Sequence, residues 1–100
     1  MYYVYVLYSL KDHRLYKGFS SNIQDRFAKH NSGGSKSTSR RKPFVLVHIE
    51  GFEEKTTALK RERHLKSPEG GSKLIAHLKA FKILGADSRL NIPIPTQPAD

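Results

Sequence analysis

Residues 2–9 read Tyr-Tyr-Val-Tyr-Val-Leu-Tyr-Ser, and residues 15–19 read Leu-Tyr-Lys-Gly-Phe. The first stretch is rich in aromatic and β-branched residues and is apolar at both alternating sets of positions. That pattern is typical of a strand that is covered on both faces and is therefore central in its sheet. The polar segment 10–14 is short enough to connect the two stretches as an antiparallel hairpin.

A third strand and three helices complete the predicted fold. Residues 44–49 are again apolar on both faces, which predicts the third strand. Helical patterns cover residues 22–31, 53–66 and 74–84, the last of them amphipathic and ended by a glycine. The sequence therefore predicts the order ββαβαα, an α+β domain with a small sheet and helices packed against it.

Local signals predict where these helices begin and end. Ser21 and Gln24 form a capping box at the start of the first helix. Asn-Ser-Gly-Gly at 31–34 ends that helix with residues that tolerate a left-handed backbone. Ser-Pro-Glu-Gly-Gly at 67–71 is expected to break the second helix, and Phe81 is expected on the apolar side of the last one.

One hundred residues are enough for a single domain. We expect this domain over residues 1–84, with its motif-bearing part at about 1–77. We expect a flexible C-terminal tail over residues 85–100, because residues 86–100 hold three prolines and no apolar period. The absence of cysteine excludes disulfides and thiolate metal sites, and no apolar run is long enough to span a membrane. The N-terminal residues show no basic region followed by an apolar region, so we expect no signal peptide and a cytoplasmic protein.

The charge of the chain favours a polyanionic partner. Eighteen Lys and Arg residues stand against nine Asp and Glu residues, which leaves a formal net charge of +9. A merely soluble basic protein is the alternative, and no basic amphipathic helix indicates a membrane surface. The polar loop 32–42 clusters cations among Ser, Thr and Gly, which suits either phosphate contacts or a solvated loop. The candidate nucleic-acid-binding residues are Lys36, Arg40, Arg41 and Lys42.

Two polar residues share the apolar face of the first predicted helix. Arg26 and His30 lie one turn apart on the side formed by Ile23 and Phe27, so they border the surface that meets the sheet. They are either candidates for a functional site or an Arg and a half-buried His at the edge of the core.

Glu62 lies in the middle of the apolar stripe of the second predicted helix. Its neighbours on that stripe are Ala58, Leu59 and Leu65. Burial of a carboxylate without a partner is costly, so Glu62 must meet a cation, hydrogen-bond donors or a metal. An internal salt bridge, for example with Arg26, and a functional site are both open.

These residues together resemble the GIY-YIG nuclease superfamily over roughly residues 1–80. They resemble most closely its small single-domain bacterial members, which are similar to the N-terminal incision domain of the nucleotide-excision-repair UvrC protein. Tyr3-Val4-Tyr5 stands in the place of G-I-Y, and Tyr16-Lys17-Gly18 stands in the place of Y-I-G. The helix Arg, the following His and the late Glu of the family match Arg26, His30 and Glu62.

The resemblance implies a three-stranded antiparallel sheet flanked by helices. It implies metal-dependent endonuclease activity of low sequence specificity on nucleic-acid phosphodiesters, with DNA as the expected substrate, RNA as the alternative and a role in DNA repair or processing. Glu62 would hold a divalent ion, Mg²⁺ or alternatively Mn²⁺.

The resemblance also implies a role for each of the other matched residues. Tyr16 would act on the attacking water, and Tyr5 would support that hydroxyl or the scissile phosphate. Arg26 would neutralise the phosphate, whose geometry an Arg fork matches. His30 would assist proton transfer or phosphate binding.

The sequence departs from the family pattern in three places. Tyr3 replaces the Gly, and Lys17 replaces the middle residue of Y-I-G; strand alternation should turn Lys17 to the opposite face. Residues 63–84 contain no Asn, whereas some members carry an active-site Asn there. The alternatives to the enzyme are a nucleic-acid-binding module of the same fold that cleaves little and a structural or partner-binding protein. A protein partner for targeting is a further expectation.

Overall fold

The computed structural model describes residues 1–34 and 38–91. Its elements are β1 (Tyr2–Ser9), β2 (Leu15–Ser20), α1 (Ile23–Ser32), β3 (Phe44–Phe52), α2 (Lys55–Lys66) and α3 (Pro68–Ala80). The predicted order ββαβαα and the α+β fold class are confirmed. In the described residues, no helix has the length and apolarity needed to cross a membrane.

The three strands form one antiparallel sheet in the order β2-β1-β3, so β1 is central as its sequence predicts. Tyr5 lies opposite Gly18 on β2 and opposite Ile49 on β3. The register between β1 and β3 shifts between Val6 and Leu7, which marks an irregularity in the ladder. The sheet thus carries Tyr5 at its centre, with one neighbouring strand on each side.

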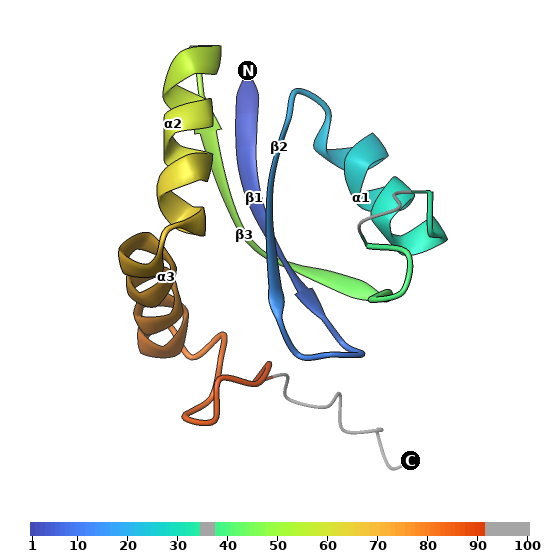
Figure 1. Ribbon diagram of the computed structural model, residues 1–100, viewed down its shortest axis with the longest axis vertical. Coiled ribbons are helices and arrows are strands. Elements are labelled where there is room, and N and C mark those ends of the chain that lie inside the picture. The colour runs from blue at the N-terminus through green and yellow to red at the C-terminus, as the bar shows by residue number, and fades with distance from the viewer. Residues whose placement is uncertain (35–37, 92–100) are drawn as a thin grey trace, which may run out of the picture.

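Helices cover both faces of the sheet (Figure 1). On one face Val4, Val6 and Tyr8 join the core formed with α2 and α3. On the other face Tyr5 and Leu7 pack beside α1 in a smaller cluster. Alternate residues of β1 therefore belong to two different layers, which explains why both faces of the strand are apolar.

The start of α1 differs from the predicted capping box. Asn22, not Ser21, is the N-cap, because its side-chain oxygen accepts a hydrogen bond from the backbone N–H of Asp25 at 3.2 Å. Its amide nitrogen also donates to the Asp25 carboxylate at 3.0 Å. The Ser20 hydroxyl oxygen accepts from the Asn22 N–H at 2.9 Å, and this bond places the turn one residue later than predicted. The predicted end is confirmed, with Gly33 as C-cap at φ 81°.

Ser67 joins α2 to α3 with a single residue. Its hydroxyl donates to the carbonyl of His64 at 2.6 Å and accepts from the N–H of Gly70 at 3.1 Å. Pro68 then occupies the first turn of α3, where the lack of an N–H costs nothing. The break after α2 is confirmed, but the next helix begins at once, and both glycines that were expected in the break lie inside α3.

Both later helices also differ from their predicted bounds. α2 begins at Lys55, because Glu54 is still extended and forms its N-cap. α3 ends at Ala80, and Phe81 is 67% exposed instead of lying on the apolar side of the helix.

Residues 83–91 fold back as a closed turn. The N–H of Gly85 donates to the carbonyl of Arg89 at 2.8 Å, and the N–H of Asn91 donates to that of Ile83 at 2.9 Å. Leu84 is buried in the core, and Leu90 packs against it. The first part of the segment predicted as a tail thus contacts the domain, and residues 92–100 lie outside the described residues.

Candidate active site

Two tyrosines from paired strands share the α1 face of the sheet. Tyr5 on β1 is buried, and Tyr16 on β2 is half-buried. Their ring centroids are 6.4 Å apart. Tyr16 faces Leu7 in the ladder, so strand alternation places it on the same side as Leu7 and Tyr5.

His30 connects this pair of tyrosines to the following loop. It lies at the end of α1 and is 2% exposed. Its Nε2 is 3.0 Å from the Tyr5 hydroxyl, and its Nδ1 is 2.7 Å from the hydroxyl of Thr38. The rings of His30 and Tyr16 are 4.8 Å apart between centroids. The structure therefore brings together the predicted residues Tyr5, Tyr16 and His30.

Arg26 and Glu62 lie within electrostatic range of the same phenol. Arg26 is exposed on α1, one turn before His30, and Glu62 lies on α2. The pKa of Tyr5 responds to both charges. The ion-pair partner of Glu62 in the described residues is Lys66 at 3.4 Å, so the alternative of a salt bridge to Arg26 is not what the structure shows.

The surroundings of Tyr5 and His30 favour their uncharged forms. The pKa of Tyr5 is raised to about 12, mainly by burial and also by Tyr16 and Glu62, whereas the charge of Arg26 acts to lower it. Burial also lowers the pKa of His30, and the positive charge of Arg26 lowers it further. At neutral pH Tyr5 is therefore a phenol that can donate a hydrogen bond, and it is poorly suited to act as a base.

Gly18 makes room for Tyr5. The two residues lie opposite each other in the ladder, and a Cβ on Gly18 would overlap the hydroxyl and ring of Tyr5. Lys17 points to the opposite face as expected, with its Nζ 3.7 Å from the Cβ position of Gly71 on α3. The Lys in the middle of the motif therefore leaves the tyrosine face unchanged.

Glu62 is the carboxylate that could hold a metal ion. Its side chain is 20% exposed, so one side of it remains accessible to water. The described residues contain no group of three or more His, Asp or Glu able to enclose an ion. One carboxylate completed by water and substrate oxygens is an ordinary donor set for Mg²⁺, and Glu62 fits such a site.

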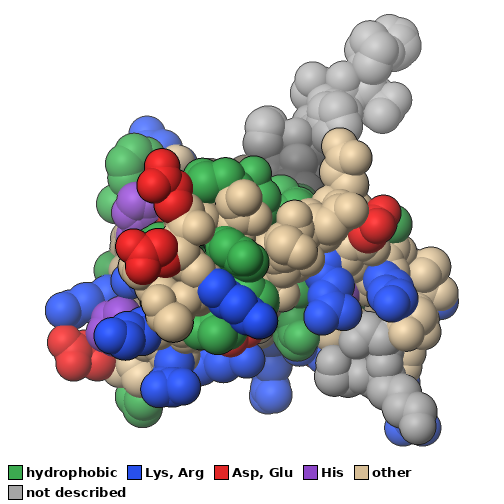
Figure 2. Space-filling view, turned by 90° about the horizontal axis from the view of Figure 1, so that it is seen from above, with side chains coloured by type: hydrophobic (Ala, Val, Ile, Leu, Met, Phe, Trp, Pro, Cys, Tyr) green, Lys and Arg blue, Asp and Glu red, His purple; other side chains and the backbone are tan. Residues whose placement is uncertain are grey.

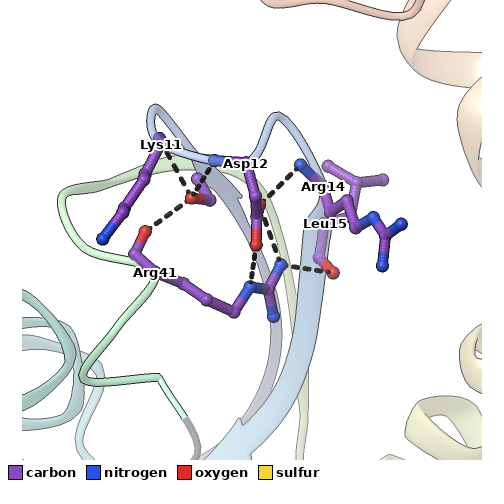
Figure 3. Close-up of polar contacts among 6 residues, drawn as sticks. Lys11, Asp12, Arg14, Leu15 and Arg41 are labelled. Atoms are coloured by element: carbon purple, nitrogen blue, oxygen red, sulfur yellow. Dashed lines mark hydrogen bonds and ion pairs between the residues drawn. The ribbon is translucent and has the colours of Figure 1, made fainter.

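The cations at residues 40–42 of the polar loop lie in two different environments. Arg40 and Lys42 are exposed, whereas Arg41 is half-buried. The Nε of Arg41 is 2.6 Å from the Asp12 carboxylate, and its Nη2 donates to the carbonyl of Leu15 at 3.4 Å (Figure 3). Arg41 thus fastens the loop to the β1–β2 hairpin, and Lys36 lies outside the described residues.

Three residues that the sequence did not single out hold the site in place. Thr38 is fully buried and bonds to His30. Asn31 donates through Nδ2 to the carbonyl of Phe44 at 3.1 Å and thereby links the end of α1 to the start of β3. The Ser9 hydroxyl, also fully buried, donates to the carbonyl of Arg41 at 2.5 Å. In the sequence these residues look like ordinary loop and cap residues. Burial sets Thr38 and Ser9 apart, and the two hydrogen bonds to the Phe44 backbone set Asn31 apart.

Comparisons with known proteins agree with the sequence motifs. The family model described as the GIY-YIG catalytic domain matches residues 1–74. A UPF0213 protein of Natronomonas pharaonis is 47% identical over 66 residues, which cover 65% of this chain and 76% of that protein. A UPF0213 protein of Clostridium perfringens is 37% identical over 94 residues, which cover 92% of this chain and all of that protein.

A solved structure is also similar to this chain. The solution structure of a UPF0213 protein from Bacillus halodurans is 36% identical, with a TM-score of 0.49 over 77% of this chain and 85% of that chain. GIY-YIG is a nuclease superfamily that acts on nucleic acid, and its nucleases are generally metal-dependent. Because the catalytic-domain model matches residues 1–74, most of the sequence, the chain belongs to the GIY-YIG family.

Proposed function

We propose that this chain is a metal-dependent endonuclease that hydrolyses phosphodiester bonds, with DNA as its main substrate and low sequence specificity. One observation carries the proposal: Tyr5, Tyr16 and His30 are in contact around one point of the sheet, with Arg26 and Glu62 in electrostatic range. The proposed setting is DNA repair or processing.

The environment of each side chain supports a different role. Tyr16, the more open of the two phenols, orients the attacking water. Tyr5 is a neutral donor that supports this hydroxyl or the scissile phosphate. Arg26 is exposed and pairs with the phosphate as negative charge builds. His30 has both ring nitrogens engaged and is buried, so it acts through Tyr5.

Glu62 would hold the metal ion, for which we propose Mg²⁺ with Mn²⁺ as a substitute. When bound, the ion supplies Lewis-acid stabilisation to the phosphodiester oxygens. Lys66 balances part of the charge of Glu62 at 3.4 Å. The carboxylate remains partly open to water, as a site that must also admit a phosphate requires.

The proposed nucleic-acid surface consists of Arg40 and Lys42 on the loop beside the site. Both are exposed, and Figure 2 shows further Lys and Arg side chains distributed over one face of the molecule. Contacts of this type bind the phosphate backbone and read no sequence, which supports low specificity.

The test is a nuclease assay on single-stranded, duplex, flap and branched DNA and on RNA, with Mg²⁺, with Mn²⁺ and with chelator. Glu62→Gln keeps the size of the side chain and removes its charge. Glu69→Gln is the matched control, because Glu69 is an exposed carboxylate on α3 that pairs with Lys73 at 3.0 Å. We expect cleavage by the wild type and Glu69→Gln, and binding without cleavage by Glu62→Gln.

Two results would contradict the endonuclease. Equal cleavage by wild type and Glu62→Gln would assign the activity to a contaminant. Metal-independent binding to every substrate without cleavage of any would show a nucleic-acid-binding module of the same fold.

A further inference from the structure

Thr38 has a buried hydroxyl next to the proposed site. Neither the sequence motifs nor the family match assigns a role to this residue. We propose that Thr38 is a positioning residue, which holds the His30 ring in a single tautomer and thereby sets the direction of the hydrogen bond between His30 and Tyr5. As an effect on catalysis, this inference rests on the proposed nuclease function.

The contacts form an unbroken chain of three side chains. The Thr38 hydroxyl is 2.7 Å from His30 Nδ1, and His30 Nε2 is 3.0 Å from the Tyr5 hydroxyl. All three residues are buried, with exposed fractions of 0%, 2% and 3% for Thr38, His30 and Tyr5. Water therefore does not compete for these bonds, and a hydrogen bond removed here is not readily replaced.

The chemistry of imidazole connects the two ends of this chain. An uncharged imidazole has one N–H donor and one acceptor nitrogen, so its two nitrogens always play opposite roles. If Nδ1 accepts from Thr38, Nε2 must donate to Tyr5, and the phenol proton of Tyr5 is free to point into the site. If Nδ1 donates to Thr38, Nε2 accepts the phenol proton of Tyr5 instead. A threonine hydroxyl can itself donate or accept, so the direction of its bond to Nδ1 and the direction of the Tyr5 proton are linked through the ring and change together.

The other neighbours of the His30 ring offer no comparable control. The ring centroids of Tyr16 and Phe44 lie 4.8 and 6.0 Å away, so these residues pack against the ring. Arg26 acts on His30 only through its charge. Among the described residues, the partner of Nδ1 is Thr38.

The loop holds Thr38 firmly enough for this task. The carbonyl of Thr38 accepts from the N–H of Arg41 at 2.9 Å, and Arg41 is in turn bound by Ser9 and by Asp12 (Figure 3). Thr38 is therefore fixed relative to the end of β1, the same strand that carries Tyr5.

The experiment measures the ring nitrogens of His30 by ¹⁵N NMR in three variants. Thr38→Val keeps the shape of the side chain and removes the hydroxyl, Thr38→Ser keeps the hydroxyl, and Thr56→Val is the control on the exposed surface of α2. We expect one tautomer in the wild type, Thr38→Ser and Thr56→Val, and a mixture or the opposite tautomer in Thr38→Val. On the preferred substrate we expect kcat of Thr38→Val to fall by about 10- to 100-fold with KM unchanged, by analogy with the loss of the outer hydrogen bond of a metal-ligating histidine.

The outcomes separate this inference from the nuclease. Unchanged ¹⁵N chemical shifts of the His30 ring in Thr38→Val would overturn the inference. Two exchanging tautomers in the wild-type protein would also overturn it, and this measurement does not depend on whether a variant folds. If the ¹⁵N shifts of the His30 ring change as expected but the protein cleaves no substrate, the role of Thr38 in setting the tautomer is supported. The proposed nuclease function is then refuted.

Discussion

At the scale of single residues, Gly18 tests whether Tyr5 must stand where the structure places it. In Gly18→Ala the new methyl group would overlap the hydroxyl and ring of Tyr5. Tyr5 is buried and bonded to His30, so it can yield only by losing that bond. We expect the cleavage rate to fall about 100-fold, the effect typical of a displacement near 1 Å. Overpacking should lower the free energy of unfolding by about 1–3 kcal/mol.

The matched control is Gly51→Ala on β3. A Cβ there would meet the end of the flexible Met1 side chain at 2.9 Å and the Tyr3 ring at 3.5 Å, and Met1 can move aside. Cleavage by this variant should equal that of the wild type in the same assay. If both variants cut normally, the position of the Tyr5 hydroxyl is irrelevant to the rate.

His30 makes the protein sensitive to acid. In the folded protein, burial and the charge of Arg26 lower the pKa of His30. As the pH falls below about 6.5, the unperturbed pKa of His, the unfolded chain therefore binds more protons than the folded protein. The free energy of unfolding should therefore fall with decreasing pH, by up to about 1.4 kcal/mol per pH unit for this group. His30→Gln should remove that part of the slope in urea titrations at pH 5 and pH 7. Identical slopes in the two proteins would show that His30 titrates normally in the fold.

The residues of the site differ in how far the sequence could predict them. The ordered motifs predict five site residues, namely Tyr5, Tyr16, Arg26, His30 and Glu62. The structure brings Tyr5, Tyr16 and His30 into contact, and Arg26 and Glu62 act on Tyr5 through their charges. The contact between His30 and Thr38 depends on how the loop after α1 turns back, which no periodicity records. Gly18 looked like a motif residue, but its steric reason needed the register of β1 against β2.

At the scale of elements, Gly70 controls how closely α2 and α3 approach. A Cβ on Gly70 would overlap the backbone carbonyl of His64, which cannot rotate away as a side chain can. Gly70→Ala should therefore separate the helices and lower the free energy of unfolding by about 1–3 kcal/mol. Gly71→Ala is its control, because a Cβ there would lie 3.5 Å from the Leu65 carbonyl, an ordinary contact. Gly71→Ala should stabilise α3 by up to about 1 kcal/mol, and thermal or urea unfolding that moved both variants in the same direction would contradict this packing.

The elements themselves were predictable, and so were the ends of α1 and α2, whereas the starts of the helices were not. Both faces of β1 are apolar, and this pattern alone indicates a central strand. Asn22 is the N-cap in place of Ser21 because the hydroxyl of Ser20 accepts the N–H of Asn22 and fixes the turn one residue later. Ser20 and Ser21 have the same side chain, so the sequence does not show which of them makes this contact. Gly70 and Gly71 read as a break, although close packing of two helices is what requires the first of them.

At the scale of the whole molecule, the net charge of +9 predicts binding that weakens with salt. Arg40 and Lys42 are exposed, so the pair Arg40→Ala and Lys42→Ala should reduce the slope of log K against log salt. The expected reduction is about 0.9 for each duplex phosphate that the variant no longer neutralises. The measurement is a fluorescence-anisotropy titration of duplex DNA at several salt concentrations.

Arg41→Ala is the internal comparison for this prediction. The sequence grouped Arg41 with the phosphate contacts, but its guanidinium is held by Asp12 at 2.6 Å. Its removal should leave the slope nearly unchanged and reduce the free energy of unfolding by up to about 1 kcal/mol, since the pair is partly exposed. A slope unaffected by the Arg40 and Lys42 substitutions would remove this loop from the nucleic-acid surface.

β1 belongs to two layers at once, and this has a consequence for errors in folding. Val4 and Val6 pack with α2 and α3, whereas Tyr5 faces α1. A slip of β1 by one residue would exchange these sides, sending Tyr5 into the larger core and a valine to the site. Because both faces of β1 are apolar, such a slip would keep apolar side chains in both layers, but it would overpack the larger core with Tyr5 and take the Tyr5 hydroxyl away from the site. The packing of the larger core therefore disfavours the same shift in register that would remove Tyr5 from the site.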